Sequence, residues 1–207
     1  MTDQALPNKS LNNISESDLL RIPSYILAPV QSYLKNADIK KIERAYTFAF
    51  IAHDGQKRKD GSAYISHPVA VAKIVAELKM DPDSICAALM HDVIEDCDVP
   101  KTVLEKNFGS DVANIIDGVS KLGKIKMQNK AETNANNFQK MALAMANDVR
   151  VILVKLCDRV HNMRTIDFMP RRKQIIKSQE TLDIYAPLAL RVGMINIKNE
   201  LEERAFR

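Results

Sequence analysis

Hydrophobic side chains recur every three to four positions along most of the chain, which is the spacing of amphipathic helices. The clearest example is residues 39–53, which follow Asp38 as the expected helix cap and precede the helix-breaking Gly55. The apolar side chains expected on the buried face of this segment are Ile42, Ala45, Phe48, Ala49 and Ala52. The pattern therefore predicts helices and an all-α fold.

The same spacing predicts further helices on both sides of this segment. Around residues 17–34 the helical pattern is interrupted near Pro23 and Pro29, because proline cannot donate a backbone hydrogen bond. The remaining predicted helices span residues 67–78, 81–95, 100–108, 110–122, 138–147 and 149–166, a stretch that begins at 170, and residues 195–207. Pro187 and Gly193 should bend or end the helix that begins at residue 170.

Three segments are expected to lie outside regular structure. Residues 1–14 are polar and form a loosely attached leader. Residues 54–66 are charged and contain glycine, which predicts a loop between two helices. Residues 121–137 contain 4 lysines and 4 asparagines with few apolar side chains, which predicts an exposed loop.

Composition narrows the class of protein without naming a function. A chain of 207 residues can bury the core of one large domain, and 6 glycines with 8 prolines are too few for an all-β chain. The net charge of +4 comes from 30 basic and 26 acidic side chains spread along the sequence, so it does not indicate direct nucleic-acid binding. Local basic clusters at residues 57–59, 121–126 and 171–173 are candidate phosphate contacts, although each is also typical of solvated surface.

The cysteines and the chain's apolar runs point to a cytoplasmic protein. Cys86, Cys97 and Cys157 are odd in number and form no CxxC pair, which indicates neither a disulfide framework nor a thiolate zinc site. No signal-peptide core and no apolar run of membrane-spanning length is present, so no membrane partner is expected. The common phosphate-loop, hydrolase-elbow and zincin motifs are also absent.

Four side chains of this sequence have the chemistry of metal ligands. The adjacent pair His91-Asp92 joins His67 upstream and Asp158 downstream, and two imidazoles with two carboxylates suit one divalent transition metal. Taken alone, a histidine before a proline is typical of a helix start, and a buried aspartate is typical of a hydrogen-bonded core. Together on apolar helices they favour a metal site, because burying them unpaired is costly.

Further polar residues accompany these candidate ligands. Glu95 and Asp96 follow the His-Asp pair by four positions each, which would place two more carboxylates one helical turn away. Asn162 and Thr165 follow Asp158 at helical spacing and give an apolar helix a polar stripe. Both groups are candidates for chemistry beside the metal.

These residues resemble a known superfamily. The order H…HD…D matches the signature of the HD phosphohydrolases, which are metal-dependent helical bundles. More narrowly, five strings are similar to the hydrolase domain of RelA/SpoT homologues, enzymes that make and degrade the alarmone ppGpp. The strings are AHDGQKRKDGSAYISHP, AALMHDVIEDC, FGSDVANIIDGVSKL, VKLCDRVHNMRT and ETLDIYAPLALRVGMINIKNELEERAF. The resemblance runs from about residue 45 to residue 207.

The resemblance implies a role for each matching position. The implied ligands of one Mn²⁺ ion are His67, His91, Asp92 and Asp158. The implied catalytic acids are Glu95 and Asp96. The implied nucleotide contacts are Arg58, Lys59, Tyr64, Asn162 and Thr165. Asp60, Ser62-Ala63 and Cys97 depart from the family pattern, which affects base recognition rather than the chemistry.

The resemblance also implies an activity and a domain organisation. The expected reaction is 3′-pyrophosphohydrolysis of ppGpp or pppGpp to GDP or GTP and pyrophosphate, in the stringent response. The expected divisions are a leader with a helical extension (1–37), the hydrolase domain (38–190) and the start of a linker helix (191–207). That linker would lead to the synthetase and regulatory domains of a long bifunctional SpoT-type enzyme. Two alternatives are an HD phosphohydrolase for another nucleotide and a non-catalytic alarmone-binding module.

Overall fold

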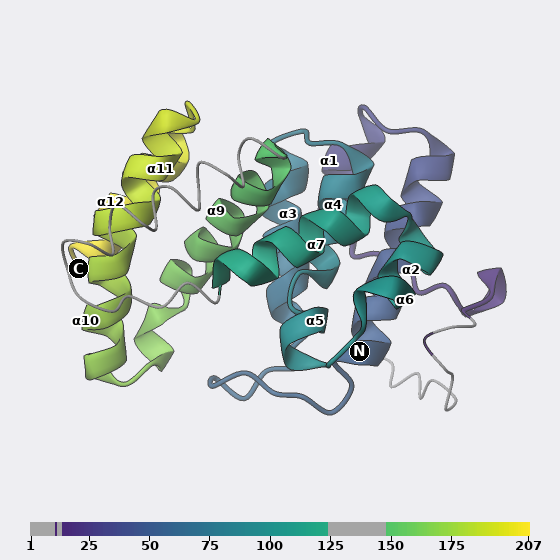
Figure 1. The fold of residues 1–207 in the computed structure, drawn as a ribbon, viewed down its shortest axis with the longest axis horizontal. Helices are drawn as coiled ribbons and strands as arrows, with labels where there is room; N and C mark the ends of the chain where they lie inside the picture. Colours follow the sequence, from purple (N-terminus) through teal and green to yellow (C-terminus); the bar gives the residue numbers. More distant parts are fainter. Residues whose placement is uncertain (1–10, 12–13, 124–147) are drawn as a thin grey trace.

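The computed structural model describes residue 11 and residues 14–123 and 148–207, and these parts of the chain are helical (Figure 1). The first stretch contains η1 (Glu16–Asp18), α1 (Ser24–Gln31), α2 (Asn36–Ala52), α3 (Ser66–Glu77), α4 (Pro82–Met90), α5 (Val93–Asp96), α6 (Lys101–Phe108) and α7 (Ser110–Gly123). The second contains α9 (Val149–Arg164), η2 (Ile166–Phe168), α10 (Arg171–Glu180), the π-helical η3 (Thr181–Tyr185), α11 (Ala186–Arg191) and α12 (Ile195–Ala205). The described residues form no strand beyond one isolated bridge between Lys57 and Ala63, which confirms the all-α prediction.

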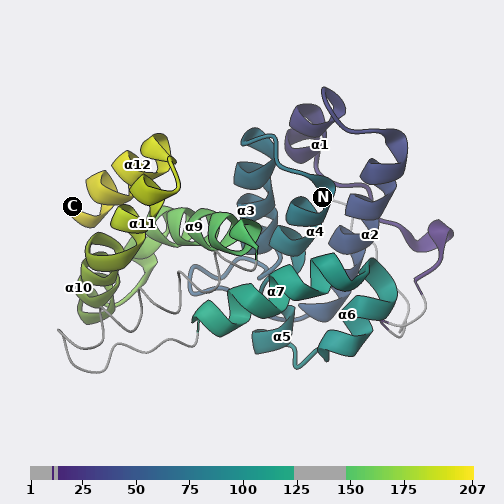
Figure 2. The same cartoon turned by 45° about the horizontal axis from the view of Figure 1, so that its top comes forward.

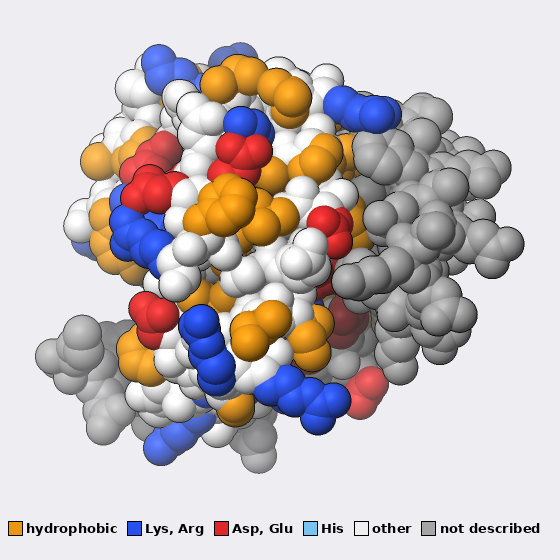
Figure 3. Space-filling view, turned by 90° about the vertical axis from the view of Figure 1, so that its left-hand side faces the viewer, with side chains coloured by type: hydrophobic (Ala, Val, Ile, Leu, Met, Phe, Trp, Pro, Cys, Tyr) orange, Lys and Arg blue, Asp and Glu red, His pale blue; other side chains and the backbone are white. Residues whose placement is uncertain are grey.

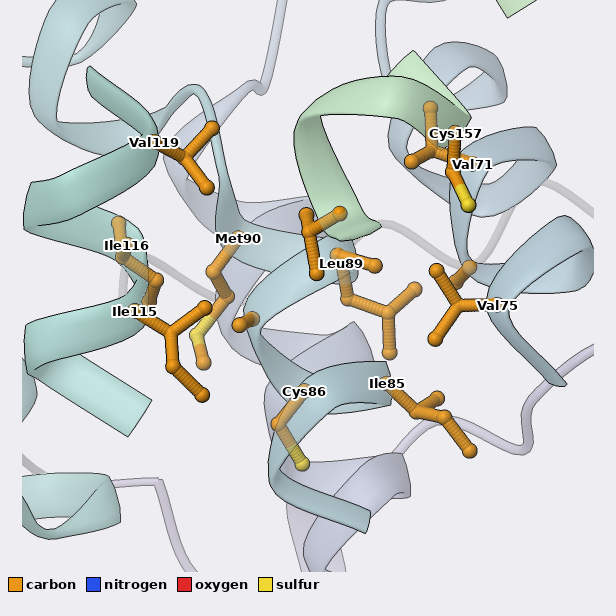
Figure 4. Close-up of a cluster of buried hydrophobic side chains, with 14 of the residues drawn as sticks. Val71, Val75, Ile85, Cys86, Leu89, Met90, Ile115, Ile116, Val119 and Cys157 are labelled. Carbon is orange, nitrogen blue, oxygen red and sulfur yellow. The ribbon is translucent and has the colours of Figure 1, made fainter. Parts of the chain in front are cut away.

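Helix α4 lies at the centre of the larger helical group. It contacts α2, α3, α7 and α9, and every residue from Ser84 to Met90 is buried. Figure 4 shows side chains of α4 packed between α7 on one side and α3 with α9 on the other. The labelled side chains are Ile85, Cys86, Leu89 and Met90 of α4, Ile115, Ile116 and Val119 of α7, Val71 and Val75 of α3, and Cys157 of α9. Each large aliphatic side chain buried here stabilises the fold by roughly 1.5–3 kcal/mol.

Helix α9 connects the larger group to the C-terminal helices (Figures 1 and 2). It packs on α3, α4 and α7 in the first group, and on α12 in the second. Ile197 and Leu201 of α12 are buried, so this helix packs on the helical body through an apolar side. The outer face of the C-terminal helices carries hydrophobic side chains scattered among basic and acidic ones (Figure 3).

The predicted continuous helix over residues 81–95 is wrong, because the chain breaks at His91-Asp92. Helix α4 ends at Met90 and α5 begins at Val93. The Asp92 carbonyl then accepts the backbone N–H groups of Glu95 and Asp96, at 3.0 and 2.8 Å, and starts the new turn. Successive residues of an unbroken helix point about 100° apart. The break removes that constraint on where the two adjacent side chains point.

Two helix limits also differ from the sequence-based prediction. Helix α2 begins at Asn36, so Asp38 lies in its first turn and accepts the Lys35 backbone N–H at 3.2 Å. Helix α7 continues to Gly123, so the predicted loop cannot begin at residue 121. The rest of that loop, the predicted helix over 138–147 and most of the leader lie outside the described residues.

The predicted end of a helix at Gly193 is confirmed, whereas Pro187 lies in the first turn of α11 and does not end a helix. Pro187 has no N–H, and one turn earlier the helix widens so that the Ala186 N–H bonds to the Thr181 carbonyl. Gly193 has a φ of +78°, which other residues rarely adopt, and it separates α11 from α12. Among the described residues, no helix has the length and apolar content needed to cross a membrane.

Candidate active site

Three separate parts of the fold bring the candidate ligands together. His67 lies at the start of α3, His91 and Asp92 form the junction between α4 and α5, and Asp158 lies in the third turn of α9. Because α4 and α9 are both buried along the apolar core, the polar groups on them meet inside the protein. His67, His91 and Asp158 are exposed by only 3%, 1% and 5%.

The ligand atoms of these residues are close enough to share one ion. One donor atom each from His67, His91 and Asp158 falls within 4.8 Å of the others. Asp92 lies beside this group, with its two carboxylate oxygens 3.5 Å from His67 Nε2 and 3.2 Å from His91 Nε2. The structure thus forms a buried His-His-Asp candidate metal site with a second carboxylate at its edge.

The orientation of His91 fits a metal ligand. Its Nδ1 lies 2.9 Å from the Ala88 carbonyl oxygen, which can only accept, so Nδ1 carries the hydrogen. Its Nε2 therefore has a lone pair when the imidazole is neutral, and this nitrogen is buried, lies 3.2 Å from Asp92 Oδ1 and makes no hydrogen bond with the described residues. A buried nitrogen without a partner is costly unless something else occupies its lone pair. A divalent cation meets that need, and a backbone carbonyl on the second nitrogen is typical of metal-bound histidines.

The two oxygens of Asp158 have different partners. Lys155 Nζ lies 2.9 Å from Oδ2, whereas Oδ1 accepts the Asn162 side-chain N–H at 2.5 Å and lies 3.3 Å from His67 Nε2. Burial acts to raise the pKa of Asp158, but Lys155 and the two candidate-ligand histidines outweigh it and hold the pKa well below its usual range. Asp158 is therefore a carboxylate, with Oδ1 directed at the imidazoles.

Charge is concentrated around the two imidazoles even without a cation. Burial acts to lower the pKa of His91, but Asp92 and Asp158 beside it raise the pKa to about 10. The same pairing lowers the pKa of Asp92 against the opposing effect of burial. The site therefore attracts positive charge at the position where the candidate ligands meet.

The two acids of α5 lie on different sides of this cluster. The Tyr64 hydroxyl lies 2.5 Å from Asp96 Oδ2 and 2.8 Å from Asp92 Oδ2, so it links the acid to a candidate ligand. Burial and these carboxylates raise the pKa of Tyr64 far above its usual range, so the phenol keeps its hydrogen. Glu95 instead faces the end of α7, where its Oε1 would lie 3.0 Å from a β-carbon at Gly123.

A cavity of about 400 Å³ opens over the candidate ligands. Its lining includes His67, Asp92 and Asp158, and also all five predicted nucleotide contacts, which are Arg58, Lys59, Tyr64, Asn162 and Thr165. Among the residues that the structure describes, four basic and three acidic side chains line it, which suits a polyanion once a cation is bound. The volume is within the usual range for small-molecule sites. The structure therefore brings three of the four candidate ligands and all five predicted contacts to the lining of one cavity, while His91 is buried next to these ligands.

The loop before α3 is joined to α9 across this cavity. Arg58 donates a hydrogen bond from Nη2 to Thr165 Oγ1 at 3.3 Å, and the Thr165 hydroxyl lies 3.1 Å from the His161 carbonyl oxygen. The basic loop and the polar stripe of α9 are thus two walls of one site, although more than 100 residues separate them in sequence.

Two residues that the sequence analysis did not identify belong to the surroundings of the site. Lys155 is ion-paired to Asp158, and His161 Nδ1 lies 2.8 Å from His67 Nδ1. Burial, His67 and Arg58 lower the pKa of His161 to about 4, so this imidazole is neutral at pH 7. Both residues lie three positions from Asp158, so helical spacing from a candidate ligand was the signal that could have found them.

The fold and the site together define a helical protein with a buried candidate metal centre below a basic cavity. The sequence of residues 45–195 matches the HD domain family, so the chain belongs to that family. The resemblance noted in the sequence is therefore confirmed at the level of the family.

The curated relatives are long enzymes. The chain is 53% identical, over 176 residues, to guanosine-3′,5′-bis(diphosphate) 3′-pyrophosphohydrolase of Vibrio cholerae serotype O1. The aligned region covers 85% of this chain and 25% of that protein. It is 50% identical, over 177 residues, to the bifunctional (p)ppGpp synthase/hydrolase SpoT of Escherichia coli K12, and this alignment covers 86% of this chain and 25% of SpoT. A GTP pyrophosphokinase of Myxococcus xanthus is also 50% identical, and the alignment covers 86% of this chain and 24% of that protein. The chain thus spans about a quarter of the length of these relatives.

A solved structure has the same fold. It is described as a metazoan ortholog of SpoT that hydrolyzes ppGpp and plays a role in starvation responses. The TM-score is 0.62 at 24% sequence identity, and the match covers 83% of this chain and 95% of the other. At this identity the likeness supports the helical HD fold.

Proposed function

We propose that the chain is a metal-dependent 3′-pyrophosphohydrolase domain that converts ppGpp or pppGpp to GDP or GTP and pyrophosphate. The observation that carries the proposal is the convergence of His67, His91, Asp92 and Asp158 beneath a cavity with a basic rim. The names of the long relatives, several of which are 3′-pyrophosphohydrolases, support this substrate.

The residues that would hold the ion are the two imidazoles and two carboxylates of this cluster. Nitrogen and oxygen donors in this mixture suit Mn²⁺, which we propose as the resident ion, one per site. When bound, such an ion lowers the pKa of water and polarises a phosphoryl oxygen. The orphaned Nε2 of His91 supports this assignment.

Proton transfer is assigned to the acids of α5. Asp96 shares the hydrogen of Tyr64 with Asp92, so its carboxylate is held beside the candidate ligands and can accept a proton from attacking water. Glu95 lies on the other side of the cluster, near Lys155 and Gly123. We assign the catalytic role to the pair, with Asp96 as the better placed proton acceptor.

Substrate recognition is assigned to the basic loop and to α9. Arg58 has a planar guanidinium that can stack on the purine, and Lys59 supplies charge for phosphate. Asn162 and Thr165 offer an amide and a hydroxyl on the opposite wall of the cavity. Arg58 bonds to Thr165 and Asn162 bonds to Asp158, so a nucleotide contact from either side chain would compete with one of these bonds.

The wider context of the domain is also part of the proposal. We assign residues 1–37 to a leader and helical extension, 38–190 to the hydrolase domain and 191–207 to the start of a linker in a longer SpoT-type enzyme. The synthetase and regulatory domains of that enzyme would be its partners. The described cysteines Cys86, Cys97 and Cys157 are free thiols, which suits a cytoplasmic location.

The proposal is tested by incubating the purified chain with Mn²⁺ and ppGpp and separating the products by anion exchange. We expect GDP and pyrophosphate in equal amounts, and no turnover after chelation. Orthophosphate as the sole phosphate product would contradict the proposed reaction.

Two alternatives are separated by the same assay. Faster turnover of a deoxynucleoside triphosphate or a cyclic nucleotide than of ppGpp would favour an HD phosphohydrolase with another substrate. Tight ppGpp binding without turnover in Mn²⁺ would favour a non-catalytic alarmone-binding module. The basic rim formed by Lys57, Arg58 and Lys59 favours the substrate with more phosphate charge, which is ppGpp.

A further inference from the structure

Two imidazoles of this protein face each other through the same kind of nitrogen. His67 Nδ1 and His161 Nδ1 are 2.8 Å apart, and the ring centroids are 4.9 Å apart. Two neutral ring nitrogens at this distance form a hydrogen bond only when one of them carries the hydrogen. The contact joins α3 to α9, the helices that carry His67 and Asp158.

The position of that hydrogen decides what His67 can bind. With the hydrogen on His67 Nδ1, the lone pair of Nε2 faces Asp92 and Asp158, where a cation could be held. With the hydrogen on His161 Nδ1, a neutral His67 carries its own hydrogen on Nε2. It can then only donate to the carboxylates, whose nearest oxygens are 3.3 and 3.5 Å away.

His91 differs from His67 in this respect. The Ala88 carbonyl can only accept, so the hydrogen of a neutral His91 is fixed on Nδ1. The partner of His67 can either donate or accept. His161 is also only partly buried, unlike His67, so it can exchange hydrogen with solvent.

We propose that His161 is a positioning residue that switches its tautomer when the cation binds to His67. In the empty site, His161 Nδ1–H donates to His67 Nδ1, and His67 Nε2–H faces the carboxylates. In the loaded site, His67 Nδ1–H donates to His161, and His161 carries its hydrogen on Nε2. Between the two states, the hydrogen shared by the two Nδ1 atoms moves from His161 to His67. Solvent takes the hydrogen of His67 Nε2 and supplies one to His161 Nε2. Each imidazole is therefore neutral in both states.

The first test measures Mn²⁺ affinity in two variants of the full chain. His161→Leu removes the acceptor, and we expect affinity to fall by about 10–100-fold, as for other outer partners of metal-bound histidines. His161→Asn keeps a side-chain oxygen that can accept from His67 Nδ1, and we expect it to restore most of that loss. Equal affinity of the Leu variant and the wild type, or equal weakness of both variants, would overturn the proposal.

The second test needs no substitution and therefore does not depend on a variant folding. The chain has 4 histidines, so ¹H–¹⁵N spectra of its imidazoles can resolve each tautomer. We expect a diamagnetic divalent ion such as Zn²⁺ to move the hydrogen of His67 from Nε2 to Nδ1 and that of His161 from Nδ1 to Nε2. His53, whose Nδ1 lies 2.9 Å from Gln56 Oε1, is the internal control and should not change.

The proposal rests on the candidate metal site, and the two can fail separately. If the wild type binds neither Mn²⁺ nor Zn²⁺, the metal site and the proposed function are wrong. If it binds these ions while His67 keeps one tautomer throughout, the switch alone is wrong.

Discussion

The chemistry of single residues is best seen at Asp158, where one carboxylate serves two purposes. Lys155 bonds to Oδ2 and leaves Oδ1 facing the imidazoles, so the aspartate is both the partner of a buried ammonium and a candidate metal ligand. Removing one member of a buried ion pair leaves an uncompensated charge. Loss of the Asp158 charge should therefore do more damage than loss of one metal ligand, because it also leaves the buried Lys155 ammonium without its partner.

Asp158→Asn is expected to weaken Mn²⁺ binding more than the loss of a residue that only hydrogen-bonds to a ligand, which typically costs roughly 10–100-fold. The reason is that a neutral amide replaces a charged ligand. Calorimetric titration with Mn²⁺ measures this. Asp96→Asn is the matched control, since it makes the same chemical change outside the candidate ligand set. We expect this control to bind Mn²⁺ normally while turnover falls by about 10²–10⁴-fold. Full activity of the control would contradict the role assigned to Asp96.

At the scale of elements, helix α7 approaches α9 through a glycine. A β-carbon at Gly118 would lie 2.8 Å from one methyl carbon of Val151 and 3.0 Å from the other. Glycine is unfavourable inside a helix by about 1 kcal/mol relative to alanine. Its presence here is therefore explained by the close packing of the two helices.

Gly118→Ala is expected to destabilise the protein, because overpacking costs about 1–3 kcal/mol and outweighs the gain in helix propensity. Denaturant unfolding measures the change. In a Val151→Ala background the same substitution should cost less, since the colliding methyl groups are gone. An equal cost in both backgrounds would show that the Val151 contact is not responsible.

An ion-pair group connects α9 to α12. Glu200 accepts from Arg164 Nε and Nη2 at 2.7 and 2.8 Å, and from Arg204 Nε at 2.7 Å. The bond from Arg164, together with Arg204, lowers the pKa of Glu200 from 4.5 to about 2. A lowered carboxyl pKa stabilises the fold above the unfolded-state pKa, and this contribution is lost as pH falls through the folded-state pKa.

Glu200→Gln is expected to lower the free energy of unfolding at pH 7 by about 1 kcal/mol or less, because this ion-pair group is partly exposed and solvent screens its charges. The difference from wild type should shrink as pH falls from about 4.5 to 2. Urea unfolding at several pH values measures it. Glu203→Gln, which removes an exposed pair between Glu203 of the same helix and Arg207 beyond its end, is the control and should change little. A Glu200→Gln difference independent of pH would contradict the assigned linkage.

At the scale of the whole molecule, the candidate metal site lies where three parts of the fold meet. The start of α3, the α4–α5 junction and α9 each supply a candidate ligand. An ion bound there would connect the α4–α5 junction to α9, whose candidate ligands His91 and Asp158 are more than 60 residues apart along the chain. Binding only to the folded state raises the stability of that state.

Adding Mn²⁺ at about 100 times its dissociation constant is expected to stabilise the protein by about 2.7 kcal/mol. For a chain of this size that corresponds to a rise in melting temperature of roughly 5–10 °C. Thermal unfolding with Mn²⁺ and with a chelator measures it. Asp158→Asn should show no rise, and an equal rise in that variant would place the ion elsewhere.

Much of the helical organisation could be predicted from the sequence, because helix formation follows local patterns. The limits of α6 and α7 lie within one residue of their predicted positions, and the buried face of α2 includes Ile42, Ala45 and Phe48 as expected. The α4–α5 break could not be predicted, since the apolar spacing of residues 81–95 runs through it and no proline or glycine lies at the break. Tertiary contacts overrode that local preference.

The sequence by itself determined the all-helical class and supplied the four donor groups of the candidate site, because periodicity and side-chain chemistry are properties of the chain alone, and its motif strings carried the resemblance to the HD family. Only the tertiary structure decided that Lys155 pairs with Asp158, that Tyr64 joins Asp92 to Asp96, and that His161 faces His67. The physical reason is that each of these contacts depends on the packing of α9, α3 and the α4–α5 junction, and packing sets distances that no local pattern contains.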